Sequence, residues 1–282
     1  MRDESPSVQK ILVAANASPH SQAALATAVQ LAAAVEAEVE GVFVEDEQLL
    51  RAAELPFAAE VRAHSHPPMP LTNRRVERQL RRQAEQAEAA LQRTAQQWDV
   101  PHSFRVVKGH VTHELRSAAA DADLLALGKT STDSSRRRLG STARSLFSEC
   151  GPSLLVLRSA PPPTQPILTY FDGSAAGMRT LALAAQLARR HDAGRLRVLL
   201  PARTDDAFEH LRDTVRAQYG DMDSPVEVHA LTPSETDQLA ALAHHTSGGL
   251  VVLPHGCAPL SSVPLQRFLY ELDRPLLLVR GA

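Results

Sequence analysis

An internal repeat is the feature that most constrains how this chain folds. A constant offset of 156 residues (167 − 11) superimposes the segment that starts at Ile11 on the segment that starts at Ile167. Four matches define the offset: Ile11 with Ile167, Ser18 with Ser174, Leu25 with Leu181, and Gln30-Leu31-Ala32 with Gln186-Leu187-Ala188. The ends of the copies also match, because residues 152–158 are similar to residues 275–280. A repeat of this length predicts a tandem duplication of one structural unit.

The duplication predicts two domains, residues 1–160 and residues 164–282. A chain of 282 residues is long enough for two domains that each bury a hydrophobic core. The copies are joined by Ser159-Ala160-Pro161-Pro162-Pro163-Thr164-Gln165-Pro166, a proline-rich sequence typical of a short, stiff linker.

Within each copy, short apolar runs alternate with segments of helical periodicity. Strands are expected at residues 11–15, 39–44, 104–108, 124–127 and 154–157, and in the second copy at 167–170, 226–231, 250–253 and 276–279. Alternation of this kind predicts an α/β fold, with a doubly wound, parallel, five-stranded sheet of Rossmann type in each copy. Ligands of such sheets bind beyond the carboxyl ends of the strands, where the winding direction reverses. The residues that follow the first and fourth strands are therefore the candidates for a binding site.

The fourth strand of the first copy leads into a polar loop that is suited to phosphate. Residues 124–127 are apolar and end at Gly128 and Lys129, and a loop with three arginines follows. Gly140-Ser141-Thr142 then begins a segment with helical periodicity, where free backbone N–H groups and the helix dipole favour an anion. An ordinary connection with solvated arginines is the alternative. Gly128-Lys129-Thr130 does not end a Walker A motif, because the first glycine of that motif would fall at Asp123.

The long segment between the second and third strands of the first copy has two parts. Residues 50–72 contain four prolines and are expected to be irregular. His64 and His66 lie in this part but have no third ligand nearby, so no metal site is predicted. From Val76 to Trp98 the apolar residues follow helical spacing, and the charged opposite face is expected to be solvated. A short helix is expected at residues 114–120, after the third strand.

Charge and composition exclude several classes of partner. Lysine and arginine number 30 against 32 acidic residues, so no basic excess is available to hold a nucleic acid. The apolar runs are broken by charged residues before they reach the length of a membrane span, and no membrane partner is expected. The N-terminus lacks the apolar segment of a signal peptide, and Cys150 and Cys257 do not suggest a disulfide framework. The expected location is the cytoplasm.

Asn16-Ala17-Ser18, the repeat, and the spacing from Gly128 to Gly140-Ser141-Thr142 resemble the universal stress protein family, in its tandem form. The resemblance covers nearly all of both copies. It implies an adenine nucleotide lying across the first and fourth strands. By this resemblance Asn16 takes the position of the acid that holds the ribose, and the backbone of Val44 meets the adenine. Gly128, Gly140, Ser141 and Thr142 take the positions of the phosphate loop, with Lys129 beside them.

The first copy departs from the family pattern at three points. Ser131 replaces the second glycine, eight residues (132–139) replace nine, and Asn16 replaces aspartate. One interpretation is that the positive charge of Lys129 and the nearby arginines compensates for a weaker backbone loop, and the alternative is a solvated loop. The second copy keeps the acid as Asp172, but Pro254 and Pro264 remove backbone N–H groups from its loop. The second copy is therefore predicted to bind no nucleotide in this way.

The favoured hypothesis is a cytoplasmic stress-response protein whose first copy binds ATP or AMP as a regulatory ligand. The alternative is an interaction or scaffold module in which both sites have decayed. A third class is slow ATP hydrolysis, although no residue is assigned a catalytic role. Expected partners are an adenine nucleotide, an unidentified protein and a second copy in a homodimer. The resemblance also implies that the two copies pair through residues 154–157 and 276–279 as an intramolecular pseudo-dimer.

Overall fold

The structure is a computed structural model that describes residues 8–16, 18–60, 69–128, 145–146, 153–157, 166–190, 195–201, 204–220, 226–231, 249–257, 272 and 274–280. The first half contains β1 (Lys10–Ala14), α1 (Pro19–Val35), β2 (Glu38–Asp46), α2 (Glu47–Ala52), β3 (Ala59–Glu60), β4 (Met69–Pro70), α3 (Asn73–Gln97), β5 (His102–Gly109), α4 (Val111–Ala119), β6 (Leu124–Gly128) and β7 (Ser153–Leu157). The second half contains β8 (Ile167–Tyr170), α6 (Ala175–Arg190), β9 (Leu196–Pro201), α7 (Asp205–Tyr219), β10 (Val226–Leu231), β11 (Val251–Pro254) and β12 (Leu276–Val279).

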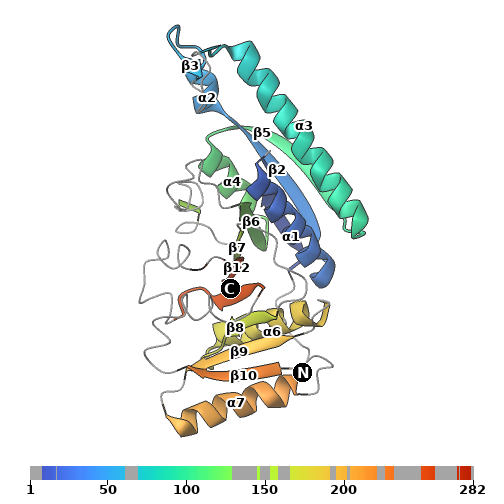
Figure 1. The fold of residues 1–282 in the computed structure, drawn as a ribbon, viewed down its shortest axis with the longest axis vertical. Helices are drawn as coiled ribbons and strands as arrows, with labels where there is room; N and C mark the ends of the chain where they lie inside the picture. The colour runs from blue at the N-terminus through green and yellow to red at the C-terminus, as the bar shows by residue number, and fades with distance from the viewer. Residues whose placement is uncertain are drawn as a thin grey trace.

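The main sheet has ten strands in the order β10-β9-β8-β11-β12-β7-β6-β1-β2-β5. All neighbours within each half are parallel, and the two halves follow the same strand order outward from the junction. At the junction β12 and β7 are antiparallel, with Leu277 opposite Leu155. The predicted α/β class with a mostly parallel sheet is confirmed. The two five-stranded sets are continuous as one sheet (Figure 1). The predicted domain boundary lies outside the described residues and stays a prediction.

Helices cover both faces of the sheet. Helices α1, α3, α6 and α7 pack on one face, where a single cluster of buried residues extends through both halves. Helix α4 packs on the other face of the first half, against residues such as Leu12 and Leu125. The strands near the junction are buried on both faces, which explains why they read as continuous apolar runs. Helices α3 and α7 lie toward opposite ends of the long axis (Figure 1).

Local structure differs from the sequence-based expectation in two places. The region expected to be irregular contains helix α2 and a small antiparallel hairpin, β3–β4. Ala53 at the end of α2 packs with Val76 and Leu80 of α3, so this short helix depends on tertiary contacts that local propensity does not show. Helix α4 begins at Val111, three residues earlier than expected, and Val111 packs against the core on that face.

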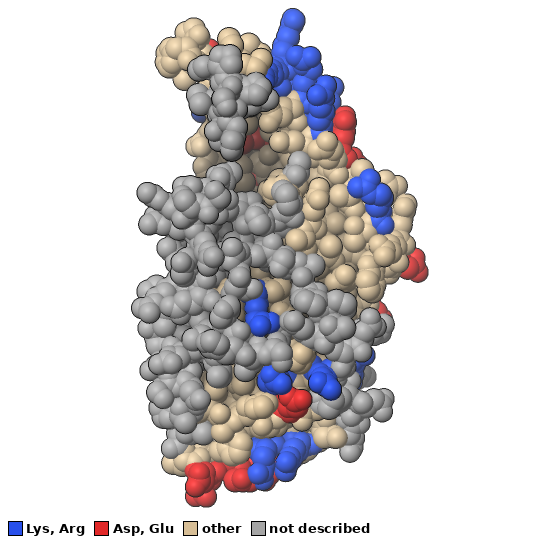
Figure 2. Space-filling view, in the orientation of Figure 1, with Lys and Arg blue, Asp and Glu red and all other residues tan. Residues whose placement is uncertain are grey.

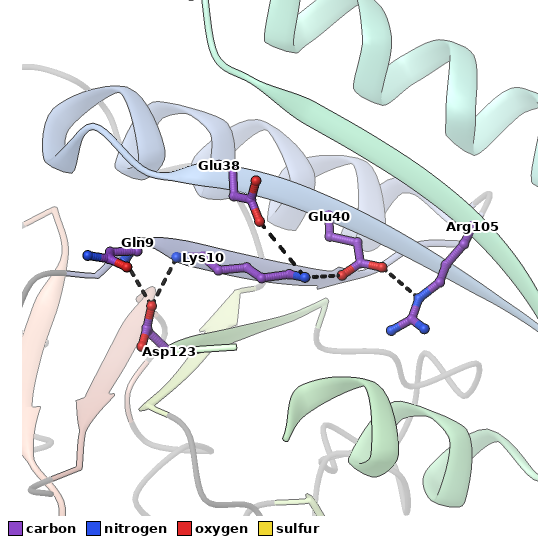
Figure 3. A network of polar contacts seen from close by, with 6 residues as sticks. All are labelled: Gln9, Lys10, Glu38, Glu40, Arg105 and Asp123. Carbon is purple, nitrogen blue, oxygen red and sulfur yellow. Dashed lines mark hydrogen bonds and ion pairs between the residues drawn. The ribbon is translucent and has the colours of Figure 1, made fainter. Parts of the chain in front are cut away.

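A polar network joins the three outer strands of the first half near their amino ends (Figure 3). The carboxylate of Glu40 on β2 is buried and lies 2.8 Å from Lys10 Nζ on β1 and 2.6 Å from Arg105 Nε on β5. Asp123, just before β6, accepts hydrogen bonds from the backbone N–H groups of Gln9 and Lys10. Asp123 therefore anchors the start of β1 to β6.

Replacing Glu40 by glutamine is expected to lower the free energy of unfolding by about 1–2 kcal/mol, because the amide cannot make two charge-assisted hydrogen bonds. The hydrogen bond from Lys10 to Glu40 is the main reason that the pKa of Lys10 lies above its ordinary value of 10.5. A raised pKa in the folded state stabilises the protein below pH 10.5, and this contribution is lost as the pH rises through the folded-state pKa. Urea titrations should show the difference between the two proteins shrinking above that pH. A constant difference would contradict the pairing.

Candidate functional site

The sheet places Asn16, Val44 and Gly128 at one edge. Ala14 is opposite Val42, so Asn16 lies level with Val44. Val13 is opposite Ala126, so Gly128 at the end of β6 lies level with Ala15. Strand β1 lies between β2 and β6, and the winding direction reverses between β1 and β6. The carboxyl ends of these three neighbouring strands therefore form the edge where a doubly wound sheet binds its ligand.

Asn16 is held in a hydrogen-bonded turn that leads into α1. Its side-chain Oδ1 accepts a hydrogen bond from the Ser18 N–H at 2.9 Å, and its own N–H donates to Ser21 Oγ at 2.8 Å. Ser18 Oγ caps the helix by accepting from the Ser21 N–H at 3.2 Å, with Pro19 in the first helical position. Because Oδ1 is occupied by the turn, the Asn16 side chain presents its amide NH2 group as a donor.

Val44 lies beyond the last described backbone pairing between β2 and β1. The pairing of β2 with β1 ends at Ala14 and Val42, and the Ala15 N–H donates to the Val42 carbonyl at 2.9 Å. Alternate residues of a strand direct their backbone groups to the same side, so the N–H and C=O of Val44 also face the β1 side. Strand β1 has ended at this level, and these groups face the space beyond it. The arrangement suits a planar ligand with both a donor and an acceptor.

The remaining predicted site residues are Lys129, Ser131, Gly140, Ser141 and Thr142, and all five lie outside the described residues. Their part in the site stays a prediction. Within the described part, Gly128 pairs with Leu157 of β7 and forms the last residue of its strand. The structure therefore describes where Asn16, Val44 and Gly128 lie, and the roles of all the predicted site residues stay predictions.

The second half repeats two of the hydrogen bonds of the turn around Asn16. Asp172 Oδ1 accepts from the Ser174 N–H at 3.0 Å, and Ser174 Oγ accepts from the Gly177 N–H at 2.9 Å. The difference lies in polarity, since the second oxygen of Asp172 is an acceptor where Asn16 has a donor. The position of Ser21 is taken by Gly177, where a Cβ would come within 2.8 Å of Asp172 Oδ1.

Two prolines distinguish the carboxyl edge of the second half from that of the first. Tyr170 is opposite Leu199, so the position equivalent to Val44 is Pro201, which has no N–H to donate. Leu168 is opposite Val251, which places Pro254 at the position of Gly128, as the sequence predicted. Pro201 was missed because the constant offset of 156 aligns Val44 with Leu200, whereas the strand register requires an offset of 157 (201 − 44).

An open depression of about 680 Å³ lies at the opposite, amino edge of the first half. It is lined by Gln9, Lys10, Glu36, Ala37, Glu38, Pro101, Asp121 and Asp123. Four of these side chains are acidic and one is basic, so the depression disfavours a phosphate group. Among the described residues no group of three or more His, Cys, Asp or Glu side chains is arranged to hold a metal ion. His64 and His66 lie outside the described residues.

The fold and the turn after β1 define a doubly wound α/β protein. The profile of the universal stress protein family matches residues 7–158, more than half of the chain, and the chain therefore belongs to this family of stress-response proteins. The family resemblance drawn from the sequence is confirmed. No curated protein matches the sequence.

Solved structures share this fold along nearly the whole chain. A universal stress protein from Archaeoglobus fulgidus DSM 4304 is 13% identical, with a TM-score of 0.69 over 97% of this chain and 98% of that protein. A functionally unknown protein from Pseudomonas aeruginosa PAO1 is 15% identical, with a TM-score of 0.61 over 99% and 95%. The cytoplasmic domain of a prokaryotic cation chloride cotransporter is 10% identical, with a TM-score of 0.52 over 96% and 94%. At these identities the likeness concerns the fold alone.

Proposed function

We propose that the first half binds one adenine nucleotide, ATP or AMP, as a regulatory ligand at the carboxyl edge of β2, β1 and β6. The observation that supports this proposal best is the backbone of Val44, whose N–H and C=O face the space beyond the end of β1. An adenine ring offers a donor and an acceptor on one edge, which complements these two groups. The Asn16 amide lies level with Val44 and is available to a ribose oxygen.

A comparison of the two halves supports a degenerate site in the second half. Pro201 cannot donate to an adenine ring, and Pro254 cannot donate to a phosphate. The proposed stoichiometry is therefore one nucleotide per chain. Residues 1–160 and 164–282 are proposed as the two domains of a tandem protein, paired through β7 and β12 as an intramolecular pseudo-dimer. The antiparallel junction between these strands supports that pairing.

The variant Val44→Pro tests the adenine position by giving the first half the chemistry of the second. The Val44 N–H faces the β1 side, so the substitution spares the pairing of β2 with β5. In the second half, β9 already holds Pro201 at the equivalent level beside β10, so a proline is compatible with this strand geometry. Loss of one hydrogen bond is expected to weaken ATP binding about tenfold, measured by isothermal titration calorimetry. Pro201→Val is the matched control and should leave the affinity and the single-site stoichiometry unchanged.

Gly140→Arg provides an independent variant at the predicted phosphate position, and it should abolish the thermal shift that ATP produces. If wild-type protein shows no heat of binding and no thermal shift at millimolar ATP, the nucleotide proposal fails and the interaction module without a nucleotide becomes the better account. A stoichiometry of two nucleotides per chain would instead contradict the degenerate second site.

A further inference from the structure

Five arginines form one continuous face on the first third of α3. Arg74, Arg75, Arg78, Arg81 and Arg82 fall within nine residues, and we call them the α3 arginine face. At 100° per residue they occupy an arc of roughly 120° and a length of roughly 12 Å along the helix. They lie opposite the buried residues of α3, and Glu77 is the single acid among residues 74–82. Figure 2 shows basic side chains gathered at this end of the molecule.

The placement of these charges is unfavourable for the helix itself. The amino end of a helix carries a partial positive charge that favours acids, yet the first turn of α3 contains no acidic residue. Arg74, Arg78, Arg81 and Arg82 are exposed, and none of the four forms an ion pair with a described acidic residue. Arg51 and Arg212, by contrast, each pair with a glutamate on their own helix. An external anion at this face would offset the self-repulsion of the arginines and their unfavourable interaction with the helix dipole.

Exposed apolar side chains adjoin the α3 arginine face. Leu49, Leu55, Phe57 and Met69 are 39%, 47%, 80% and 43% exposed, and we call them the apolar tip. The Leu71 N–H donates to the Ala58 carbonyl, which holds the chain around Phe57 beside the start of α3. Met69 Sδ lies 3.6 Å from Arg75 Nη1, so the two surfaces are in contact. Helix α2, the hairpin and the start of α3 lie together at one end of the long axis (Figure 1).

We propose that this end of the molecule docks on an anionic lipid surface. Arginines beside a membrane of acidic lipids each contribute attraction, and apolar side chains between them insert at the boundary between headgroups and acyl chains. A protruding end suits a flat partner. None of the described helices is long and apolar enough to span a bilayer, so the proposed attachment is peripheral. The sequence predicts no membrane partner because it lacks an apolar run of spanning length, and attachment at the membrane surface needs no such run.

The composition of the apolar tip favours lipid over nucleic acid. Single-stranded nucleic acids are held by aromatic side chains that stack on bases. Three of the four exposed side chains, Leu49, Leu55 and Met69, are aliphatic and have no face for stacking. Aliphatic side chains and phenylalanine rings both partition into the boundary between headgroups and acyl chains, so all four side chains of the apolar tip suit a lipid surface. Binding of single-stranded nucleic acid by the α3 arginine face is therefore the competing outcome of the test.

The test is cosedimentation of the full chain with vesicles of phosphatidylcholine alone or mixed equally with phosphatidylglycerol. Wild-type protein should bind the anionic vesicles and release at high salt. The triple variant Arg78→Gln, Arg81→Gln, Arg82→Gln should bind on the order of a hundredfold more weakly. Each arginine near an anionic surface strengthens binding by roughly fivefold, and the three contributions multiply. Arg93→Gln, Arg189→Gln, Arg216→Gln removes the same charge from exposed positions outside the face and should bind as the wild type does. Phe57→Ser should weaken binding about fivefold.

All of these positions are exposed, so circular dichroism and the melting temperature should match those of the wild type. The proposal is overturned if wild-type protein sediments equally with both kinds of vesicle, or if the two triple variants lose equal affinity. It is also overturned if single-stranded RNA, and not the anionic vesicles, binds in a manner that depends on the α3 arginine face. ATP binding is measured separately, so failure of either proposal leaves the other intact.

Discussion

Truncating Leu277 to alanine is expected to lower the free energy of unfolding of the whole chain by about 3–4 kcal/mol. Leu277 on β12 and Leu155 on β7 are both fully buried and lie opposite each other across the antiparallel junction. Both belong to the cluster that extends through the two halves. The cavity left by the truncation therefore falls in a shared core, and the first half should lose stability together with the second.

The single tryptophan, Trp98, reports on the first half, because it follows α3. Leu277→Ala should move the urea midpoint seen by Trp98 fluorescence as far as the midpoint seen by circular dichroism. Leu55→Ala is the control, since a half-exposed leucine should cost within about 0.5 kcal/mol. An unmoved Trp98 transition would show that the two halves unfold independently, contrary to a closely packed intramolecular pair.

Replacing Gly41 by valine is expected to destabilise the protein by about 3 kcal/mol through overpacking. Gly41 lies on β2 beneath α3, and a Cβ there would come within 2.6 Å of Phe104 Cδ2 and 2.8 Å of Leu91 Cδ2. Leu91 is fully buried, so its side chain can move aside only by displacing its neighbours, and the Phe104 ring packs on the same core. The strand propensity of valine recovers only part of this cost.

A double-mutant cycle separates overpacking from other causes. Leu91→Ala alone should cost about 2–5 kcal/mol, because it leaves a cavity against β2. In the Gly41→Val background the same truncation should cost less, since it removes one of the two clashing groups. Additive effects, measured by urea unfolding, would show that Leu91 does not limit the space above Gly41. The cycle would then assign the clash to Phe104 alone.

Much of the candidate site follows from local sequence. The Ser18 cap with Pro19, and the matching turn at Asp172 and Ser174, use hydrogen bonds between residues two to five positions apart. Such contacts repeat wherever the residues repeat, so the offset of 156 located them in both copies. Strand β10 was also predicted at its observed position. The phosphate loop lies outside the described residues and remains a prediction of the sequence.

The sequence predicts the alternation of strands and helices and the turns after the first strands, because these depend on neighbours along the chain. Which residues lie level across strands depends on strand pairing between distant segments, and this pairing identifies Pro201 as the counterpart of Val44. One inserted residue shifts the alignment without shifting the hydrogen-bonded register, which is set by side-chain burial on both faces of the sheet. Tertiary contacts likewise hold the chain around Phe57 beside the start of α3, through the hydrogen bond from the Leu71 N–H to the Ala58 carbonyl.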